Sequence, residues 1–331
     1  NDNSVPGVTV RTCKHFPVTH ADLGEANILE STHLLAGLEH LNIVDESSTE
    51  LLLEKEPGVP WPKILNPNLE NDEIAKFFSS MSSRADTIVD SRDVEFVRKL
   101  GQGASATVYE GTHNGKSIAI KMIDFFPTPK RSLEKIQHEM VEELRVMSAL
   151  SDVSENVVRY YGVVTQPRFC ILLEFCPHGA LTDVLGSPKL RMDWPRFFEW
   201  AKQSARGVLD LHSWNPPIVH RDLKTLNLLV DADYRVKVAD FGLSRFLADD
   251  VSQSTLGRMR GTYAYTDPEI YDGIKFSAKA DMFSLGIIMW ELVYRTLKGE
   301  YQRPYAEYPF MNRDFQIIIQ VARKNVRPTI P

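Results

Sequence analysis

The strongest constraint on the fold is a pattern of short alternating segments in the middle of the chain. Apolar and polar residues alternate over Val94–Leu100, 107–110 and 117–123. A period of two is typical of strands with one buried face. Asn114-Gly115 separates two of these segments, and the pair predicts a tight hairpin because both residues tolerate positive φ. The pattern therefore predicts a small antiparallel sheet.

A longer period follows this sheet. Residues 133–150 favour a helix, and a further strand is expected over Phe169–Phe175. After that strand, apolar residues recur with the 3.6-residue period of helices, most clearly over Trp194–Ser213, Lys279–Tyr294 and Arg313–Lys324. A strand-rich lobe followed by a helical lobe, with no internal repeat, predicts an α+β fold of two lobes.

Residues 1–92 differ from the rest, with long polar intervals and few aromatic residues. The prolines of Pro57–Pro67 are too dense for a regular element. Short helices are expected around Ala21–Leu41 and where four apolar residues share one helical face, at Ile74, Phe77, Phe78 and Met81. Two interpretations stay open: a partly ordered linker, or a regulatory flank that packs on the following domain.

The composition excludes several classes of function. With 38 Lys and Arg against 44 Asp and Glu, the net charge of −6 argues against a nucleic-acid or anionic-membrane binder. Apolar runs such as Leu285–Trp290 are far shorter than the ~18 residues of a membrane span. Cys13, Cys170 and Cys176 form no CxxC motif or Cys/His cluster, which predicts a cytoplasmic protein without structural zinc. The first residue is Asn rather than Met, so we expect further chain upstream.

A glycine loop joins the first two predicted strands. Gly101 and Gly103 are followed by Ala-Ser-Ala106 and then by strand-like residues 107–109. A loop between two strands can cover phosphates as a flap, whereas the glycine turn of a dinucleotide-binding oxidoreductase opens a helix. The strand-like continuation excludes that oxidoreductase. Glycine pairs are common in hairpins, so the loop alone carries little weight.

Charged motifs farther along the chain add chemistry to this loop. Lys121 stands at the end of a predicted buried strand, where an ammonium group needs an anionic partner such as a phosphate or a carboxylate. His220-Arg-Asp222-Leu-Lys224-Thr-Leu-Asn227 and Asp240-Phe-Gly242 follow in that order. Several motifs in a fixed order are far more specific than the glycine loop alone.

With these motifs in this order, the chain from Asp93 to its end resembles the eukaryotic protein kinases. The resemblance implies the bilobal protein-kinase fold, with the N-lobe over residues 93–175 and the C-lobe over residues 176–331. It also implies transfer of the γ-phosphoryl group of ATP to protein substrates, with Mg²⁺ as the cofactor. It does not indicate the substrate protein, the upstream activator or the oligomeric state.

The resemblance assigns roles to the charged residues. Lys121 is similar to the lysine that holds the α- and β-phosphates, and Glu143 to its helix partner, with Glu139 as the alternative. Asp222 matches the catalytic aspartate that accepts the proton of the substrate hydroxyl. Two residues match the magnesium ligands of the family, namely Asn227 and Asp240.

The resemblance also outlines a nucleotide pocket. Glu174 and Cys176 fall where the hinge of the family grips adenine through backbone groups, and Gly101 and Gly103 where its flap covers the phosphates. The apolar residues expected to sandwich the adenine ring are Val108, Ala119 and Leu229, although core packing is an equal alternative for each. Cys176 is expected to be a small hinge residue rather than a reactive thiol, because no neighbouring base or lysine would lower its pKa.

Lys224, two residues after Asp222, resembles the serine/threonine-specific pattern. In the family, the threonine matched by Thr262 would bond to Asp222 and Lys224. Trp290-Glu291 resembles the tyrosine-kinase-like group, which includes mixed-lineage, Raf-like, receptor-interacting and Pelle-like kinases. We therefore expect Ser or Thr acceptors, and dual specificity stays open.

The chain departs from the family pattern at two motifs and at its end. Ala106 replaces the third glycine of the flap, and Asp267-Pro-Glu269 stands where most kinases have Ala-Pro-Glu. Residues 325–331 resemble the loop before the last two helices of the family, so we expect a C-terminally truncated domain. The arginine that pairs with Glu269 would lie in the missing part, which would leave a buried carboxylate without a partner.

Two questions of activity remain open from the sequence. The first concerns the polar segment 240–269, which phosphorylation at Ser252, Ser254 or Thr255 would order. The alternative is that this segment is a surface loop that phosphorylation does not control. The rival class of function is a pseudokinase or scaffold that signals by binding. The intact set of Lys121, Glu143, Asp222, Asn227 and Asp240 argues against it.

Overall fold

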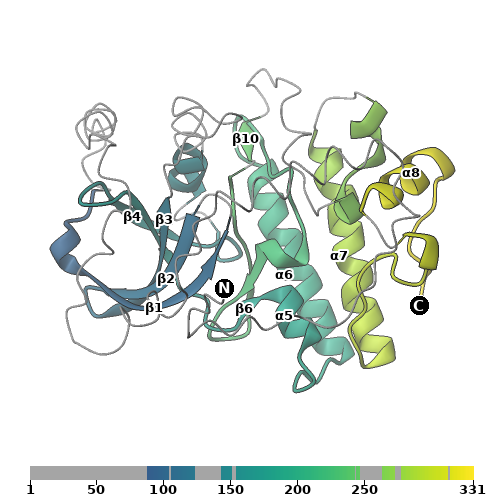
Figure 1. Ribbon diagram of the computed structural model, residues 1–331, viewed down its shortest axis with the longest axis horizontal. Helices are drawn as coiled ribbons and strands as arrows, with labels where there is room; N and C mark the ends of the chain where they lie inside the picture. The colour runs from purple at the N-terminus through teal and green to yellow at the C-terminus, as the bar shows by residue number, and fades with distance from the viewer. Residues whose placement is uncertain are drawn as a thin grey trace, which may run out of the picture. The chain divides into compact units, whose positions relative to one another are not determined.

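The computed structural model describes residues 88–103, 106–123, 143–150, 154–242, 244–246, 263–272, 277–311 and 314–331 (Figure 1). Several predicted features lie outside these ranges: the two helices of the flank, Glu139, Thr262 and the three hydroxyl residues between 252 and 255. Among the described residues, no helix is both long and apolar enough to cross a bilayer.

The first lobe is built on a five-stranded antiparallel sheet with the order β1-β2-β3-β5-β4. Its strands are β1 (Val94–Gln102), β2 (Ala106–His113), β3 (Lys116–Ile123), β4 (Tyr160–Val164) and β5 (Cys170–Glu174). Asn114 and Gly115 form the two-residue turn between β2 and β3, with φ of 51° and 72°. The predicted hairpin is confirmed, and both turn residues adopt the positive φ on which the prediction rested.

The alternation in β3 produces two distinct faces. Ile118, Ile120 and Met122 are buried and pack in one cluster with residues of β1 and β5. Ala119 and Lys121 lie on the opposite face, because successive side chains of a strand alternate. The hydrophobic pattern therefore turns Lys121 away from this cluster and toward the side that carries the polar motifs.

The second lobe is helical and contains α5 (Leu181–Gly186), α6 (Trp194–His212), α7 (Ala278–Lys298) and α8 (Asp314–Lys324). Asp193 caps α6 by accepting a hydrogen bond from the Arg196 backbone N–H, and Ser277 caps α7 in the same way. The three predicted helices are confirmed. The second runs past Tyr294 to Gly299, whose φ of 73° ends it.

Short strands in the second lobe position the polar motifs. A three-stranded sheet joins β6 (Gly179–Ala180), β8 (Leu228–Val230) and β9 (Val236–Val238), and β7 (Ile218–Val219) pairs with β10 (Arg245–Phe246). The segment from His220 to Asn227 connects β7 to β8, and Asp240 follows β9 after one intervening residue, Ala239. Both polar motifs thus lie at strand ends, where the backbone is fixed on one side.

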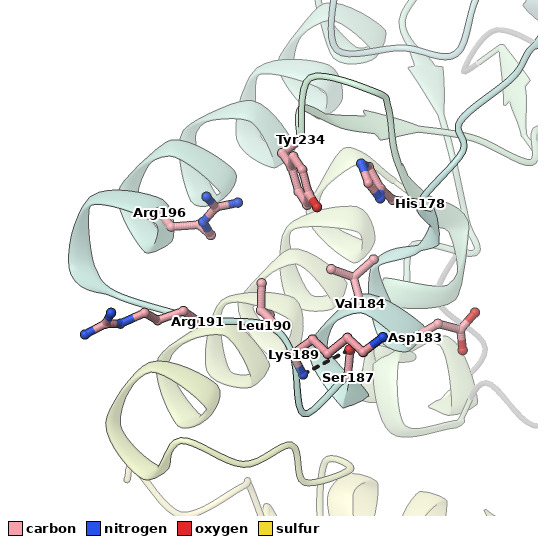
Figure 2. Close-up of a pocket in the computed structure, with 9 residues that line it drawn as sticks. All are labelled: His178, Asp183, Val184, Ser187, Lys189, Leu190, Arg191, Arg196 and Tyr234. Carbon is pink, nitrogen blue, oxygen red and sulfur yellow. Dashed lines mark hydrogen bonds between the residues drawn. The ribbon is translucent and has the colours of Figure 1, made fainter.

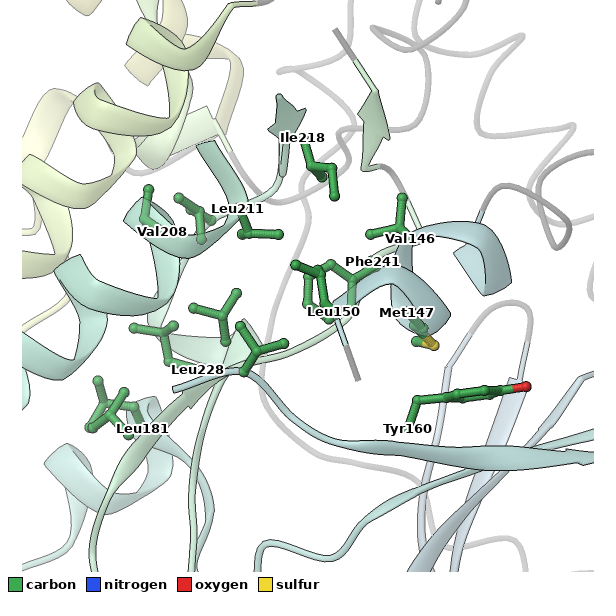
Figure 3. Close-up of a cluster of buried hydrophobic side chains, with 14 of the residues drawn as sticks. Val146, Met147, Leu150, Tyr160, Leu181, Val208, Leu211, Ile218, Leu228 and Phe241 are labelled. Atoms are coloured by element: carbon green, nitrogen blue, oxygen red, sulfur yellow. The ribbon is translucent and has the colours of Figure 1, made fainter. Parts of the chain in front are cut away.

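A shared hydrophobic core joins the two lobes (Figure 3). Residues 143–150 are helical, which agrees with the end of the predicted helix, and they contribute Met147 and Leu150. Val208 and Leu211 of α6 and Phe241 belong to the same cluster. Phe241 is 1% exposed. Because its ring is fixed in the core, the position of the preceding Asp240 is fixed as well.

The prediction for Glu269 is wrong. This residue lies in the 3₁₀ helix Pro268–Asp272 and is exposed rather than buried. An exposed carboxylate is stabilised by water and needs no cationic partner. The destabilisation expected from an unpaired buried charge therefore does not arise at this position.

Candidate active site

Lys121 and Glu143 form an ion pair that joins β3 to the helical residues 143–150 of the first lobe. Nζ of Lys121 lies 2.5 Å from Oε1 of Glu143 and 3.4 Å from Oδ1 of Asp240. Burial lowers the pKa of Lys121, but the two carboxylates more than offset it and hold the pKa above its ordinary value. The described partners of the strand lysine are thus Glu143 and, at a longer distance, Asp240, and the ammonium group stays charged.

Asp240 has an unusual backbone for a residue with a side chain, with φ of 61°. Aspartate tolerates this left-handed region better than most residues, at some cost in strain. Lys121 lowers the pKa of Asp240 below its ordinary value, and burial opposes this only in part. The left-handed turn, with Phe241 buried beyond it, directs an ionised carboxylate toward Lys121.

The two carboxylate oxygens of Asp222 differ in their hydrogen bonding. Its Oδ2 atom accepts hydrogen bonds from Nζ of Lys224 at 2.7 Å and from Nδ2 of Asn227 at 2.9 Å. Its Oδ1 atom is buried and has no hydrogen-bond partner among the described residues. The side chain is therefore held in place while one oxygen stays available to accept a proton.

The loop that carries Asp222 is anchored from below by Asp281 of α7. This carboxylate is 1% exposed and accepts hydrogen bonds from the backbone N–H groups of His220 at 2.8 Å and Arg221 at 2.9 Å. His212 contacts it as well, at 2.8 Å. The sequence analysis missed Asp281, although an acidic residue within an apolar helix is a signal that could have been used. His220 is fully buried, which fits a structural role.

Asn227 and Asp240 provide oxygen ligands of the kind that Mg²⁺ prefers. Asn227 uses its Nδ2 atom for Asp222, so its amide oxygen is the remaining acceptor. No group of three or more His, Cys, Asp or Glu side chains in the described ranges could hold a metal. Magnesium sites that combine one or two protein ligands with substrate phosphates fit such a sparse donor set.

The predicted adenine-binding residues share one side of the sheet. Val108 is paired with Lys121 and Ala119 with Leu173 across adjacent strands, so all four side chains lie on the same face. Leu173 also packs beside a cluster in the second lobe.

Two of the predicted pocket residues belong to that cluster region. Cys176 is a buried member of the cluster, and Leu229 packs against it. Burial raises the pKa of Cys176 to about 12 although Lys237, a neighbour that the sequence analysis did not expect, opposes the shift, so the thiol is mostly protonated at neutral pH. The structure thus places Ala119 beside Leu173 and packs Leu173 and Leu229 against the cluster of Cys176, whereas Val108 shares only the face of the sheet.

The glycines of the flap are not required by the fold. Gly101 and Gly103 lie at the end of β1 and in the turn after it. Neither has positive φ, and a Cβ atom would meet nothing closer than 3.6 Å at either position. A glycine that its own chain does not need is consistent with a close approach by a ligand.

Glu174 of the predicted hinge has a side-chain role that the sequence analysis missed. Its Oε1 atom lies 3.0 Å from Nζ of Lys237 on β9, and its Oε2 atom accepts a hydrogen bond from the Arg159 backbone N–H at 3.1 Å. Lys237 is buried and also lies 3.9 Å from Asp231. This network ties the end of β5 to the sheet that leads into Asp240.

A second buried carboxylate lies under the loop of Asp222. Glu291 of α7 is fully buried and accepts hydrogen bonds from three hydroxyls: Tyr265 at 2.8 Å, Tyr301 at 2.8 Å and Thr225 at 3.1 Å. Burial raises the pKa of Glu291 to about 7, although the hydroxyls oppose the shift. Because Thr225 belongs to the loop of Asp222, this cluster connects the loop to α7.

Glu291 should make the stability of the fold depend on pH. Its pKa is raised from 4.5 to about 7 on folding. The contribution of Glu291 to the free energy of unfolding is therefore fully present below pH 4.5 and is lost as the pH rises through 7. The loss should reach about 3 kcal/mol. We expect Glu291→Gln, which keeps an acceptor but cannot ionise, to remove this contribution.

Chemical denaturation of both proteins between pH 4.5 and 8 measures the effect. The free energy of unfolding of the wild type, relative to Glu291→Gln, should fall across this window. Parallel pH profiles for the two proteins would show that Glu291 does not titrate in it.

Comparison with known proteins supplies the family. A family model described as protein tyrosine and serine/threonine kinase matches residues 94–327. The stress-activated protein kinase alpha of Dictyostelium discoideum is 46% identical over 244 residues, which cover 74% of this chain and 37% of that protein. A probable serine/threonine-protein kinase of the same organism is 40% identical over 265 residues, covering 80% of this chain and 26% of the relative.

A probable tyrosine-protein kinase of Dictyostelium discoideum is 32% identical over 261 residues, covering 73% of this chain and 71% of the relative. The chain thus spans little more than a third of the length of the first relative and about a quarter of the second. The α+β fold with a strand lobe and a helical lobe agrees with the family match, which covers both lobes. The chain belongs to the protein tyrosine and serine/threonine kinase family.

Proposed function

We propose that this protein is an ATP-dependent and Mg²⁺-dependent kinase that phosphorylates Ser and Thr residues of protein substrates. The observation that carries the proposal is the hydrogen bonding of the Asp222 carboxylate. Lys224 and Asn227 hold its Oδ2 atom, and its buried Oδ1 atom is without a partner among the described residues. A carboxylate arranged in this way is suited to orient a hydroxyl group and accept its proton.

The nucleotide would bind between the two lobes. Lys121, held by Glu143, would contact the phosphates, and Gly101 and Gly103 would allow the flap to approach them closely. Adenine would lie against the apolar face, with the backbone of the hinge as its polar partner. The residues proposed for this contact are Val108, Ala119, Leu229, Glu174 and Cys176.

The chemical step is an in-line displacement at the γ-phosphorus. The oxygen of the substrate hydroxyl forms a bond to phosphorus, the bond between phosphorus and the β–γ bridging oxygen breaks, and ADP leaves. The hydroxyl proton passes to Oδ1 of Asp222. Lys224, 2.7 Å from Asp222, is placed to balance negative charge near the acceptor. Asn227 and Asp240 would hold Mg²⁺, which when bound spreads the charge on the phosphate oxygens.

Further parts of the proposal rest on the resemblance and on the names of relatives. Serine and threonine acceptors are favoured by Lys224 and by a relative that is named as a probable serine/threonine-protein kinase. We also propose membership of the tyrosine-kinase-like group, on the resemblance at Trp290-Glu291, and a cytoplasmic location, on the pattern of the cysteines. We also propose residues 93–331 as the kinase domain and residues 1–92 as its flank. A pseudokinase or scaffold is the alternative.

Three peptides that differ only in a central Ser, Thr or Tyr test the proposal. Incubation with MgATP, followed by mass spectrometry of the peptides and the protein, should find phosphate on the Ser and Thr peptides. Transfer to the Tyr peptide alone would overturn the acceptor assignment. Nucleotide binding without transfer to any peptide would favour the scaffold alternative.

A further inference from the structure

The helical lobe contains a cavity of about 570 Å³ that none of the proposed catalytic residues lines (Figure 2). Its walls come from α5, from the loop after α5, from the first turn of α6 and from the turn between β8 and β9. The residues that matter for its chemistry are His178, Asp183, Lys189, Arg191, Arg196 and Tyr234.

The lining of this cavity is cationic in a chain that carries a net charge of −6. The lining includes three cationic side chains, of Lys189, Arg191 and Arg196, and one carboxylate, of Asp183. Within the described ranges, the structure records no ion pair for any of the three cationic side chains. Their positive charge is thus not neutralised locally by described residues and favours an anionic ligand.

Arg196 is held by aromatic rings rather than by a carboxylate. Its guanidinium carbon lies 5.2 Å from the ring centroid of Tyr234 and 5.5 Å from that of Trp200. Tyr234 in turn stacks on His178, with ring centroids 4.0 Å apart. Among the described residues, the structure records no hydrogen bond from the side-chain N–H groups of Arg196, so these donors are available for an acceptor. In Figure 2 Arg196 is turned toward Tyr234, whereas Arg191 points away from the other lining residues.

The rim of the cavity is fixed before any ligand binds. Arg295 of α7 is 4% exposed, and its Nη2 atom donates hydrogen bonds to the carbonyl oxygens of Ser187 and Leu190, both at 3.0 Å. On the opposite side, the indole N–H of Trp200 donates to the carbonyl of Tyr234 at 2.8 Å. A preformed site loses less entropy on binding than a flexible one.

We propose that this cavity binds a phosphorylated peptide segment, with Arg196 as the direct partner of its phosphate group and Lys189, which Figure 2 shows turned toward Asp183, as a second cation on the wall. A phosphate monoester carries a charge of about −1.5 to −2, which the positive charges of Arg196 and Lys189 would attract, and arginine binds it in a bidentate manner. The cavity is much larger than one phosphate group requires. Val184 and Leu190 provide an apolar part of the wall for residues that flank the phosphate.

Fluorescence anisotropy with two degenerate peptide libraries tests the proposal. The libraries are identical except that one carries a central phosphoserine and the other a serine. We expect the full chain to bind the phosphoserine library at least about tenfold more tightly, which corresponds to one charge-assisted contact of ~1.4 kcal/mol. Equal affinity for both libraries would overturn the proposal.

Matched variants locate the binding. Arg196→Gln should abolish the preference for phosphoserine, whereas Arg191→Gln removes the same charge from a side chain that points away and should retain most of it. Lys189 is exposed, so Lys189→Gln should fold normally and weaken the preference even if Arg196→Gln proves unstable. An unchanged preference in Lys189→Gln and Arg196→Gln would place the site elsewhere.

Inorganic phosphate separates a peptide site from a small-anion site. Millimolar phosphate should compete weakly with the phosphoserine library, because it makes none of the flanking contacts. Competition at the affinity of the peptide itself would show that only the anion is recognised. Binding does not depend on turnover, so this test is independent of the proposed kinase activity.

Discussion

Asp222→Asn should lower the rate of phosphoryl transfer by about 10²–10⁴-fold while leaving the affinity for ATP unchanged. An asparagine can still accept the hydrogen bonds that Lys224 and Asn227 now give to Oδ2, so the loop should keep its shape. It cannot take up a proton at the position of Oδ1. The loss should therefore appear in kcat and not in nucleotide binding.

Steady-state kinetics on a defined Ser peptide, together with ATP titration by calorimetry, measure both quantities. Asp233→Asn is the matched control, because Asp233 undergoes the same chemical change at an exposed turn with a side chain 71% exposed. Its kinetics should equal those of the wild type. Full turnover in Asp222→Asn would show that another group accepts the proton.

Asp240→Asn should abolish transfer for a different reason. Asparagine tolerates the left-handed backbone of this position, so the fold should persist. The substitution removes the charged oxygen that we propose as a Mg²⁺ ligand, together with the negative partner that lies 3.4 Å from Lys121. We expect Mg²⁺ to lose its effect on ATP binding, with the affinity for the metal-bound nucleotide reduced by at least roughly 10²-fold.

Titration of ATP at several Mg²⁺ concentrations distinguishes the two variants. In the wild type and in Asp222→Asn, Mg²⁺ should strengthen ATP binding. In Asp240→Asn, the affinity should be the same with and without the metal. A normal response to Mg²⁺ in Asp240→Asn would remove this residue from the metal site.

The local elements could be predicted because their signals are local. The Asn114-Gly115 hairpin and α6 each depend on patterns within a few residues, and both are confirmed. For Lys121, the strand pattern predicted an anionic partner but did not identify which residue supplies it. The choice of Glu143 came from the family resemblance, since the two residues are 22 positions apart.

The supporting residues could not be predicted, because their partners are distant in the chain. Asp281 binds backbone groups 60 and 61 residues earlier, and the hydroxyl of Thr225 reaches Glu291 across 66 residues. The sequence marks Asp281 as an acidic residue within an apolar helix, but it contains no signal for the distant groups that such a residue binds. Glu269 failed for a related reason, because its exposure depends on how a short 3₁₀ helix packs and not on its motif.

Transfer of the γ-phosphoryl group from isotopically labelled ATP to a Ser peptide, measured side by side for the wild type and Asp222→Asn, tests the central claim most directly. If the described arrangement of Lys121, Asp222 and Asp240 is an active site, the wild type should label the peptide while the variant binds ATP equally well and labels it at least about 10²-fold more slowly. A wild type that binds MgATP but labels no peptide, or a variant as fast as the wild type, would contradict it.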